Sequence, residues 1–286
     1  MQHRTLAIAC LGLATIFGSS MAEAQYQLKN LVSNQVKQAA HTDPLLVNGW
    51  GLVHGPGTPW WISDNNSGWS TLYDGSGKQV TKLKVLIPTA GSGPSSATGL
   101  NGPGSPTGNV FNGSTDFQVQ GSASVFLFAT LDGTISGWAP QSNFNEAIVA
   151  VDNSANKTVY TGLAITSRTS GNLLYAADEA NGKVDMYDAN FAFVKSFTDT
   201  TLPAGFAPFG IQDINGLLCV TFANVNGGSG GFVDLFKEDG TFVKTLIKGA
   251  PLNAAAFGRP LRSFQFTEEE VHGKVEPFNH NRVPSF

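Results

Sequence analysis

Four segments of the chain repeat one pattern, and this repeat limits the possible folds more than any other feature of the sequence. Each segment is an apolar run, a polar turn rich in Asp, Asn and Gly, and a second run that reaches an aromatic residue; the segments are 60–74, 125–138, 173–188 and 217–236. In 134–138 and 183–187 polar and apolar residues alternate with a period of two, which is typical of a half-buried strand. The sequence therefore predicts a strand, a turn and a second strand in each segment.

A further strand precedes each segment, marked by a glycine that apolar residues follow closely. These glycines lie 48 to 57 residues apart and are Gly51, Gly108, Gly162 and Gly210. A fourth strand follows several of the segments, as at 79–83 and 241–246. Four strands in a repeat of about 50 residues are typical of a β-propeller blade, whose first strand favours small residues because the blades crowd together at the axis. A β-sandwich would explain the strands but not the repeat.

We therefore predict an all-β propeller with about four blades of four strands each in residues 25–254. The strand-like stretch 26–32 precedes the first blade, where propellers often have the strand that completes the last blade. The pattern stops after Asn253, and residues 255–286 carry four Lys or Arg and four Glu, about twice the charged fraction of 25–254. So abrupt a change looks like translation in another frame or a non-homologous end. We expect 255–286 to be an atypical, poorly ordered tail and the ring to be incomplete.

The first 24 residues have the three parts of a secretory signal peptide. Arg4 supplies the positive charge, residues 5–18 form the apolar part, and Ala22-Glu23-Ala24 is the cleavage motif. The apolar part is too short to cross a bilayer, which needs about 20 apolar residues, and no later segment is a transmembrane candidate. We expect export to the periplasm or out of the cell, after which Cys219 alone remains as a small core residue.

Charge and missing motifs exclude several classes of function. The net charge is −4 and only 13% of the residues are charged, so no basic face for nucleic acid can form. The chain has no phosphate loop, no G-x-S-x-G motif, no paired cysteine motif and no histidine cluster. The remaining partner classes are a protein, a glycan or a small ligand.

Five residues are candidates for ligand contact. His41 and Asp43 stand two residues apart before the first blade and could share a proton or a metal ion, although Asp43 before Pro44 is equally a turn starter. Asn109 and Gln212 are polar exceptions in the small first strands. Trp69 follows a turn and is a candidate for stacking on a sugar.

Two other tryptophans occupy recurring strand positions. These are Trp60 and Trp138, and their place in the repeat predicts that both belong to the core between blades.

Acidic residues recur at the end of the second strand of the blades. We expect Asp64, Asp132 and the pair Asp178-Glu179 to occupy equivalent positions that the ring turns toward one face. Oxygen ligands from several blades would suit calcium or magnesium. The alternative is that each carboxylate binds backbone N–H groups of its own turn, and recurrence in every blade favours this structural role.

Several stretches between about 30 and 253 form a recognisable set, namely 30–33, 41–52, 129–138, 160–164, 202–209 and 249–253. Together they resemble a family of exported bacterial six-bladed propellers of unknown activity, akin to NHL-repeat and gluconolactonase-like propellers. The resemblance implies the fold, export and two further blades, but no reaction. Gluconolactonase-like propellers hold a divalent metal with Glu, Asn and Asp in the channel, and the Glu is absent here.

Taken together, these features favour a binding or interaction scaffold of unknown specific function over an enzyme. The first alternative is a metal-dependent hydrolase of the lactonase type. The second is a truncated product without independent function, which rests on the composition of 255–286.

Overall fold

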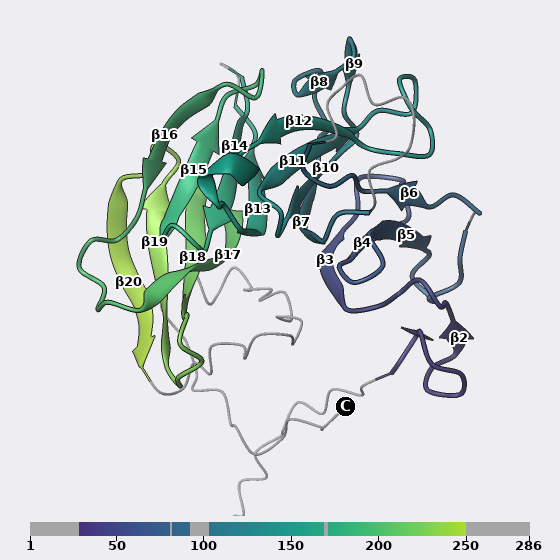
Figure 1. Cartoon of the computed structure of the whole chain (residues 1–286), viewed down its shortest axis with the longest axis horizontal. Helices are drawn as coiled ribbons and strands as arrows, with labels where there is room; N and C mark the ends of the chain where they lie inside the picture. Colours follow the sequence, from purple (N-terminus) through teal and green to yellow (C-terminus); the bar gives the residue numbers. More distant parts are fainter. Residues whose placement is uncertain (1–28, 81, 92–102, 169–170, 250–286) are drawn as a thin grey trace, which may run out of the picture.

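The computed structural model describes residues 29–249 except 81, 92–102 and 169–170, and these residues form strands joined by turns (Figure 1). One short 3-10 helix, η1 (Ser154–Asn156), interrupts them. Across these described ranges, no helix is long and apolar enough to span a lipid bilayer. The predicted signal peptide (1–24) and the predicted tail (255–286) lie outside the described residues.

Four antiparallel sheets of four strands follow one another along the chain (Figure 1). Sheet one contains β3 (Gly49–Val53), β4 (Trp60–Asp64), β5 (Trp69–Tyr73) and β6 (Val85–Leu86). Sheet two contains β7 (Pro106–Phe111), β10 (Phe126–Thr130), β11 (Thr134–Trp138) and β12 (Ile148–Asp152). Sheet three contains β13 (Tyr160–Thr166), β14 (Leu173–Asp178), β15 (Lys183–Tyr187) and β16 (Phe193–Phe197). Sheet four contains β17 (Phe206–Ile214), β18 (Leu217–Asn224), β19 (Gly231–Lys237) and β20 (Phe242–Gly249).

Within each sheet the strands are ordered as they occur in the sequence. The prediction of all-β architecture with four-stranded units is confirmed. Two small additions lie outside the sheets: β1 (Val32–Ser33) pairs in parallel with β2 (His41–Thr42), and β8 (Gln118–Val119) pairs with β9 (Ser122–Ala123).

The recurring glycines mark where the first strands of neighbouring sheets approach each other. A Cβ on Gly51 would lie 2.5 Å from the Thr107 carbonyl oxygen, and one on Gly108 would lie 2.4 Å from the Leu163 nitrogen. The same atom on Gly162 would lie 2.7 Å from the Phe209 carbonyl oxygen. Real Cβ contacts do not reach such distances, so glycine is required for backbones to pack this closely.

Side chains next to these glycines tie the first strands together. The Thr107 hydroxyl donates to the Tyr160 carbonyl at 2.7 Å, and the Thr161 hydroxyl donates to the Phe209 carbonyl at 2.8 Å. Trp50 precedes Gly51 and stacks on Phe209 with ring centroids 5.6 Å apart. The Trp50–Phe209 contact therefore joins one side chain of the first strand of sheet one to one side chain of the first strand of sheet four.

Apolar side chains fill the space between successive sheets. Alternate residues of one strand face opposite neighbours, so Phe126 and Phe128 pack toward sheet one while Leu127 packs toward sheet three. A third cluster joins sheets three and four and contains Tyr175, Met186, Val220, Phe222 and Phe236. Because β10 and β11 are buried on both faces, sheet two is an interior layer of the stack.

Three sequence predictions need correction. The fourth strand of sheet one is Val85–Leu86 and not 79–83, where Gln79 forms only an isolated bridge to Tyr73. Val32, at the described end of the stretch 26–32, pairs with β2 and not with the last strand of sheet four. Trp61, which is 2% exposed, packs between sheets one and two, whereas Trp60 is half-buried and contacts His54.

Candidate ligand-contact site

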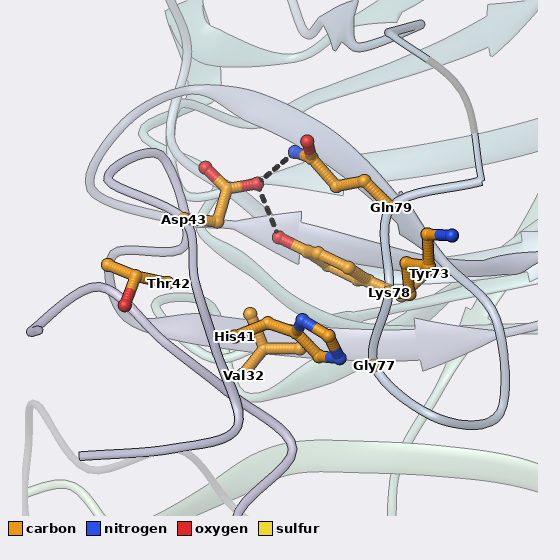
Figure 2. A pocket seen from close by; sticks show the side chains of 8 residues that line it. All are labelled: Val32, His41, Thr42, Asp43, Tyr73, Gly77, Lys78 and Gln79. Carbon is orange, nitrogen blue, oxygen red and sulfur yellow. Dashed lines mark hydrogen bonds between the residues drawn. The ribbon is translucent and has the colours of Figure 1, made fainter. Parts of the chain in front are cut away.

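A polar hollow of about 240 Å³ lies between the N-terminal strands and sheet one (Figure 2). Its lining comes from β1, β2, the end of β5 and the turn after β5, and comprises Val32, His41, Thr42, Asp43, Tyr73, Gly77, Lys78 and Gln79. A Cβ on Gly77 would lie 2.7 Å from the Leu31 Cβ, so glycine lets this turn pack against the segment that carries β1. The predicted pair His41 and Asp43 therefore lies in one site.

Asp43 holds the wall of this hollow together. Its Oδ2 accepts hydrogen bonds from the Tyr73 hydroxyl at 2.7 Å and from the Gln79 amide, and Figure 2 shows both. Its Oδ1 accepts a hydrogen bond from the Leu45 backbone N–H at 2.9 Å. This bond is typical of a residue that starts a turn, the alternative role predicted for Asp43 from its place before Pro44. Asp43 is 5% exposed, so both oxygens are committed to structural partners.

The His41 imidazole is a polar group of the hollow that is not committed to the wall. Its imidazole forms no hydrogen bond with any residue in the described ranges, and it lies beneath the Tyr73 ring in the view of Figure 2. The Lys78 ammonium points away from Asp43. His41 and Asp43 thus share a wall but are not hydrogen-bonded to each other as an acid–base pair would be.

We expect the substitution Asp43→Ala to lower the free energy of unfolding by about 2 kcal/mol, because it leaves the buried Tyr73 hydroxyl without an acceptor. Urea unfolding followed by tryptophan fluorescence measures the change. The double variant with Tyr73→Phe restores part of the loss, since no buried hydroxyl then lacks a partner. Equal losses in the single and double variants would contradict this role of Asp43.

The other three ligand-contact candidates lie elsewhere. Asn109 is buried in β7 and donates its amide to the Trp61 carbonyl at 3.1 Å. Gln212 is exposed in β17, opposite Cys219. Trp69 is half-buried, and the Lys84 ammonium lies 4.5 Å from the centre of its ring. The structure therefore does not join these residues to His41 and Asp43.

The acidic candidates are bound within their own surroundings. Asp64 ends β4 and accepts the Thr71 hydroxyl at 2.8 Å. Asp178 ends β14 and accepts the Asn181 side-chain amide at 2.7 Å, while the Glu179 backbone N–H donates to the Val159 carbonyl. In the part of the chain that the structure describes, no three His, Cys, Asp or Glu side chains are grouped so that they could hold a metal ion.

The sequence predicts that Asp132 is the counterpart of Asp64 and Asp178, but the structure places Asp132 at a different position. The residue that ends β10 is Thr130, whose hydroxyl lies 2.8 Å from that of Thr134. Asp132 lies two residues further on, in the turn, where its Oδ1 accepts the Ser105 backbone N–H at 3.3 Å. The equivalence was wrong because a polar hydroxyl replaces the carboxylate at this position in sheet two.

Burial gives Asp64 an unusual protonation state. The pKa of Asp64 is raised to about 8, chiefly by desolvation; the hydrogen bond from the Thr71 hydroxyl lowers it, and the nearby Asp43 adds a smaller rise. The folded protein thus holds a proton that the unfolded chain releases near its ordinary pKa of 3.8. Stability therefore falls as the pH rises between these two values.

We expect the free energy of unfolding to fall by up to about 1.4 kcal/mol per pH unit through this window because of Asp64. The variant Asp64→Asn keeps an oxygen for Thr71 and removes the titration, so its stability changes less with pH. Urea midpoints at pH 5 and pH 7 measure the difference. Parallel pH profiles for the two proteins would contradict the assignment.

No model of a known protein family matches the chain. Two proteins of Acanthamoeba polyphaga mimivirus are similar to it in sequence. Uncharacterized protein R648 is 28% identical over 258 residues, and uncharacterized protein L690 is 27% identical over 259 residues. Each alignment covers 83% of this chain, but only 61% and 65% of the respective relative. The chain therefore spans less than two thirds of the length of these relatives.

Solved structures resemble the arrangement of sheets. The virginiamycin B lyase from Staphylococcus aureus aligns over 69% of this chain and 54% of its own, with 12% identity and a TM-score of 0.46. The Pan2 WD40 domain of Neurospora crassa aligns over 70% and 49%, with 13% identity and a TM-score of 0.44. Like the blades of these proteins, the four sheets of the described residues each have four antiparallel strands. At these identities the likeness concerns the fold alone.

The four four-stranded antiparallel sheets agree with the blade-like repeat predicted from the sequence. The relatives in sequence are viral proteins, and not the bacterial ones that the motifs suggested. Sheets one to four are thus blade-like units, which we call blades one to four.

A buried polar network in blade three escaped the sequence analysis. The hydroxyls of Tyr160 and Tyr187 lie 2.6 Å apart, and the Asn153 side-chain amide donates to both. Tyr160 donates to Asp185 at 3.0 Å, and Lys183 pairs with the other oxygen of Asp185. Burial raises the pKa of Tyr187 to about 12, so both phenols are neutral donors. The alternation at 183–187 placed Asp185 in a strand but did not identify its partners.

Proposed function

We propose that the chain is an exported β-propeller that acts by binding a ligand and not by catalysis. The observation that carries this proposal is the commitment of Asp43. The carboxylate beside His41 is used by Tyr73, Gln79 and the Leu45 backbone, so it is not available to activate the imidazole. The hollow instead offers the His41 ring as a contact surface with a fixed wall behind it.

Export remains part of the proposal and rests on the residues of 1–24. Fractionation of cells that express the full chain tests it, with N-terminal sequencing of the product. We expect the mature protein to begin at Gln25, because the A-x-A motif ends at Ala24. A product that retains Met1 and stays in the cytoplasm would contradict export.

Saturation-transfer NMR tests the binding function with glucose, galactose, gluconate and glucuronate as probes. The sugar acids are expected to give the stronger signal, because His41 and Lys78 line the hollow. His41→Ala removes the signal if the hollow is the site. Val36→Ser is the control, because Val36 is 73% exposed and does not line the hollow.

The alternative from the sequence is a hydrolase of the lactonase type. Incubation of the protein with gluconolactone, with and without added calcium or magnesium, tests it directly. Turnover that requires the metal and is lost in Asp64→Asn or Asp178→Asn would overturn the binding proposal. A single cooperative melting transition of a monodisperse sample would also argue against a product that cannot function alone.

A further inference from the structure

An exposed phenylalanine recurs on the rim of three blades. Each one lies six residues after an aromatic residue at the end of the third strand or one residue before it, and successive phenylalanines are 49 residues apart in sequence. The pairs are Trp138 with Phe144, Tyr187 with Phe193 and Phe236 with Phe242, with ring centroids 6.3, 6.0 and 5.7 Å apart. The inner ring of each pair is buried, whereas the outer phenylalanines are 55%, 58% and 40% exposed. Half-exposed rings at a fixed period indicate a surface and not a core.

In blade one, a segment of the chain covers the position that is equivalent to these phenylalanines. The residue six after Tyr73 is Gln79, and the two form an isolated antiparallel bridge, as Tyr187 and Phe193 pair in blade three. Here Gln79 and Tyr73 both donate to Asp43, which directly follows the short strand β2. An extended segment with a carboxylate therefore covers the rim of blade one.

Blades three and four carry the same three residues at this rim. Phe193-Val194-Lys195 begins β16 and Phe242-Val243-Lys244 begins β20, and all six side chains are exposed. We call these six residues the Phe-Val-Lys rim. Both strands are the last in their sheets and lie on the outer side of the molecule (Figure 1). Each thus presents backbone groups on its outer edge to another strand.

The positive charge of the Phe-Val-Lys rim decides which kind of partner can bind there. Lys195 and Lys244 follow the apolar pair in each strand, and Lys248 is exposed further along β20. Asp239 lies near Lys195 and Lys237, so one acidic side chain faces this group of cations. Edge-to-edge pairing of two copies would bring lysines of one copy against those of the other, which disfavours self-association.

We infer that the Phe-Val-Lys rim binds an extended acidic segment of a partner protein. This inference rests on the proposed binding function and names its partner class. The outer edge of β16 or β20 would supply backbone hydrogen bonds, the phenylalanine and valine would contact alternate apolar side chains, and the lysines would face carboxylates. Two equivalent strands on neighbouring blades allow one long segment to engage both.

The test measures fluorescence anisotropy of a synthetic peptide of about twelve residues that alternates valine and glutamate. The full chain is expected to bind it, and a peptide that alternates valine and lysine at least about tenfold more weakly. The double variant Phe193→Ser with Phe242→Ser is expected to weaken binding at least about tenfold. Val36→Ser is the matched control, because Val36 is 73% exposed away from the rim. The double variant Lys195→Glu with Lys244→Glu should reverse the preference between the peptides.

Other outcomes would overturn the inference. Equal affinity for both peptides, or equal affinity of wild type and the Phe193→Ser and Phe242→Ser variant, excludes the rim as the site. Binding to phosphatidylserine vesicles without peptide binding would assign the rim to a lipid surface. A dimer in sedimentation equilibrium that the serine variant abolishes would assign it to a second copy. If the peptide does not bind but a sugar acid gives a signal that depends on His41, this inference alone is rejected. Metal-dependent turnover of the lactone would reject the proposed function itself.

Discussion

Alanine at Gly108 is expected to lower the free energy of unfolding by about 3 kcal/mol. The added Cβ would lie 2.4 Å from the Leu163 nitrogen and 2.9 Å from the Leu163 Cβ, on the first strand of the next blade. The contact is with backbone, so no side-chain rotation relieves it. Blades two and three must separate, which also lengthens the bond from the Thr107 hydroxyl to the Tyr160 carbonyl. Urea unfolding of the two proteins measures the difference.

Gly75→Ala is the matched control for this prediction. Gly75 lies in a turn of blade one, and a Cβ there would meet no atom within 4 Å. Its effect on stability is expected to stay within about 0.5 kcal/mol. If both alanine variants unfold at the same urea concentration, the close approach of the blades does not depend on glycine.

The blades were predictable because their sequence signals are local. A glycine before an apolar pair, a polar turn and a strand that ends in an aromatic residue each require only neighbouring residues. Gly108 and Gly162 lie at the closest approach of the first strands, as the repeat implied. The hydroxyls of Thr107 and Thr161 were not predictable, because their acceptors lie 53 and 48 residues away in the next blade.

The candidate site was predictable only in part for the same reason. The spacing of His41 and Asp43 brought them to one wall, since both flank the end of β2. Tyr73 and Gln79, which decide what Asp43 does, are 30 and 36 residues away and carry no sequence signal of this contact. Phe193 and Phe242 are 49 residues apart, so the sequence does contain a signal for these exposed residues. The spacing alone does not separate surface from core, because apolar residues in strands usually indicate core.

Trp60 and Trp61 show how a shift of one residue along a strand changes which side chain is buried between the blades. Successive side chains of a strand face opposite sides, so the neighbours Trp60 and Trp61 cannot both face blade two. The repeat placed Trp60 in the core between blades, but Trp61 takes that place. Trp61 pairs with Leu72 of β5, and both side chains are buried in the core between blades one and two, a pairing that periodicity alone does not reveal.

Trp61→Ala is therefore expected to destabilise the protein by about 3–5 kcal/mol. The indole is 2% exposed, and its ring centroid lies 4.2 Å from that of Phe126 and 4.7 Å from that of Trp138. Its removal leaves a cavity between blades one and two that these rings cannot fill without losing their own contacts. Thermal and urea unfolding measure the loss.

Two further variants separate packing from the indole N–H. The Nε1 of Trp61 is buried and has no hydrogen-bond partner among the residues described, so Trp61→Phe removes an unsatisfied donor while it keeps an aromatic ring. We expect this variant to lose less than half as much stability as Trp61→Ala. Trp60→Ala should also lose less, because Trp60 is half-buried and contacts His54 outside the interface of the blades. A larger loss at Trp60 than at Trp61 would mean that the register of β4 is shifted by one residue and that Trp60 is the side chain that joins blades one and two.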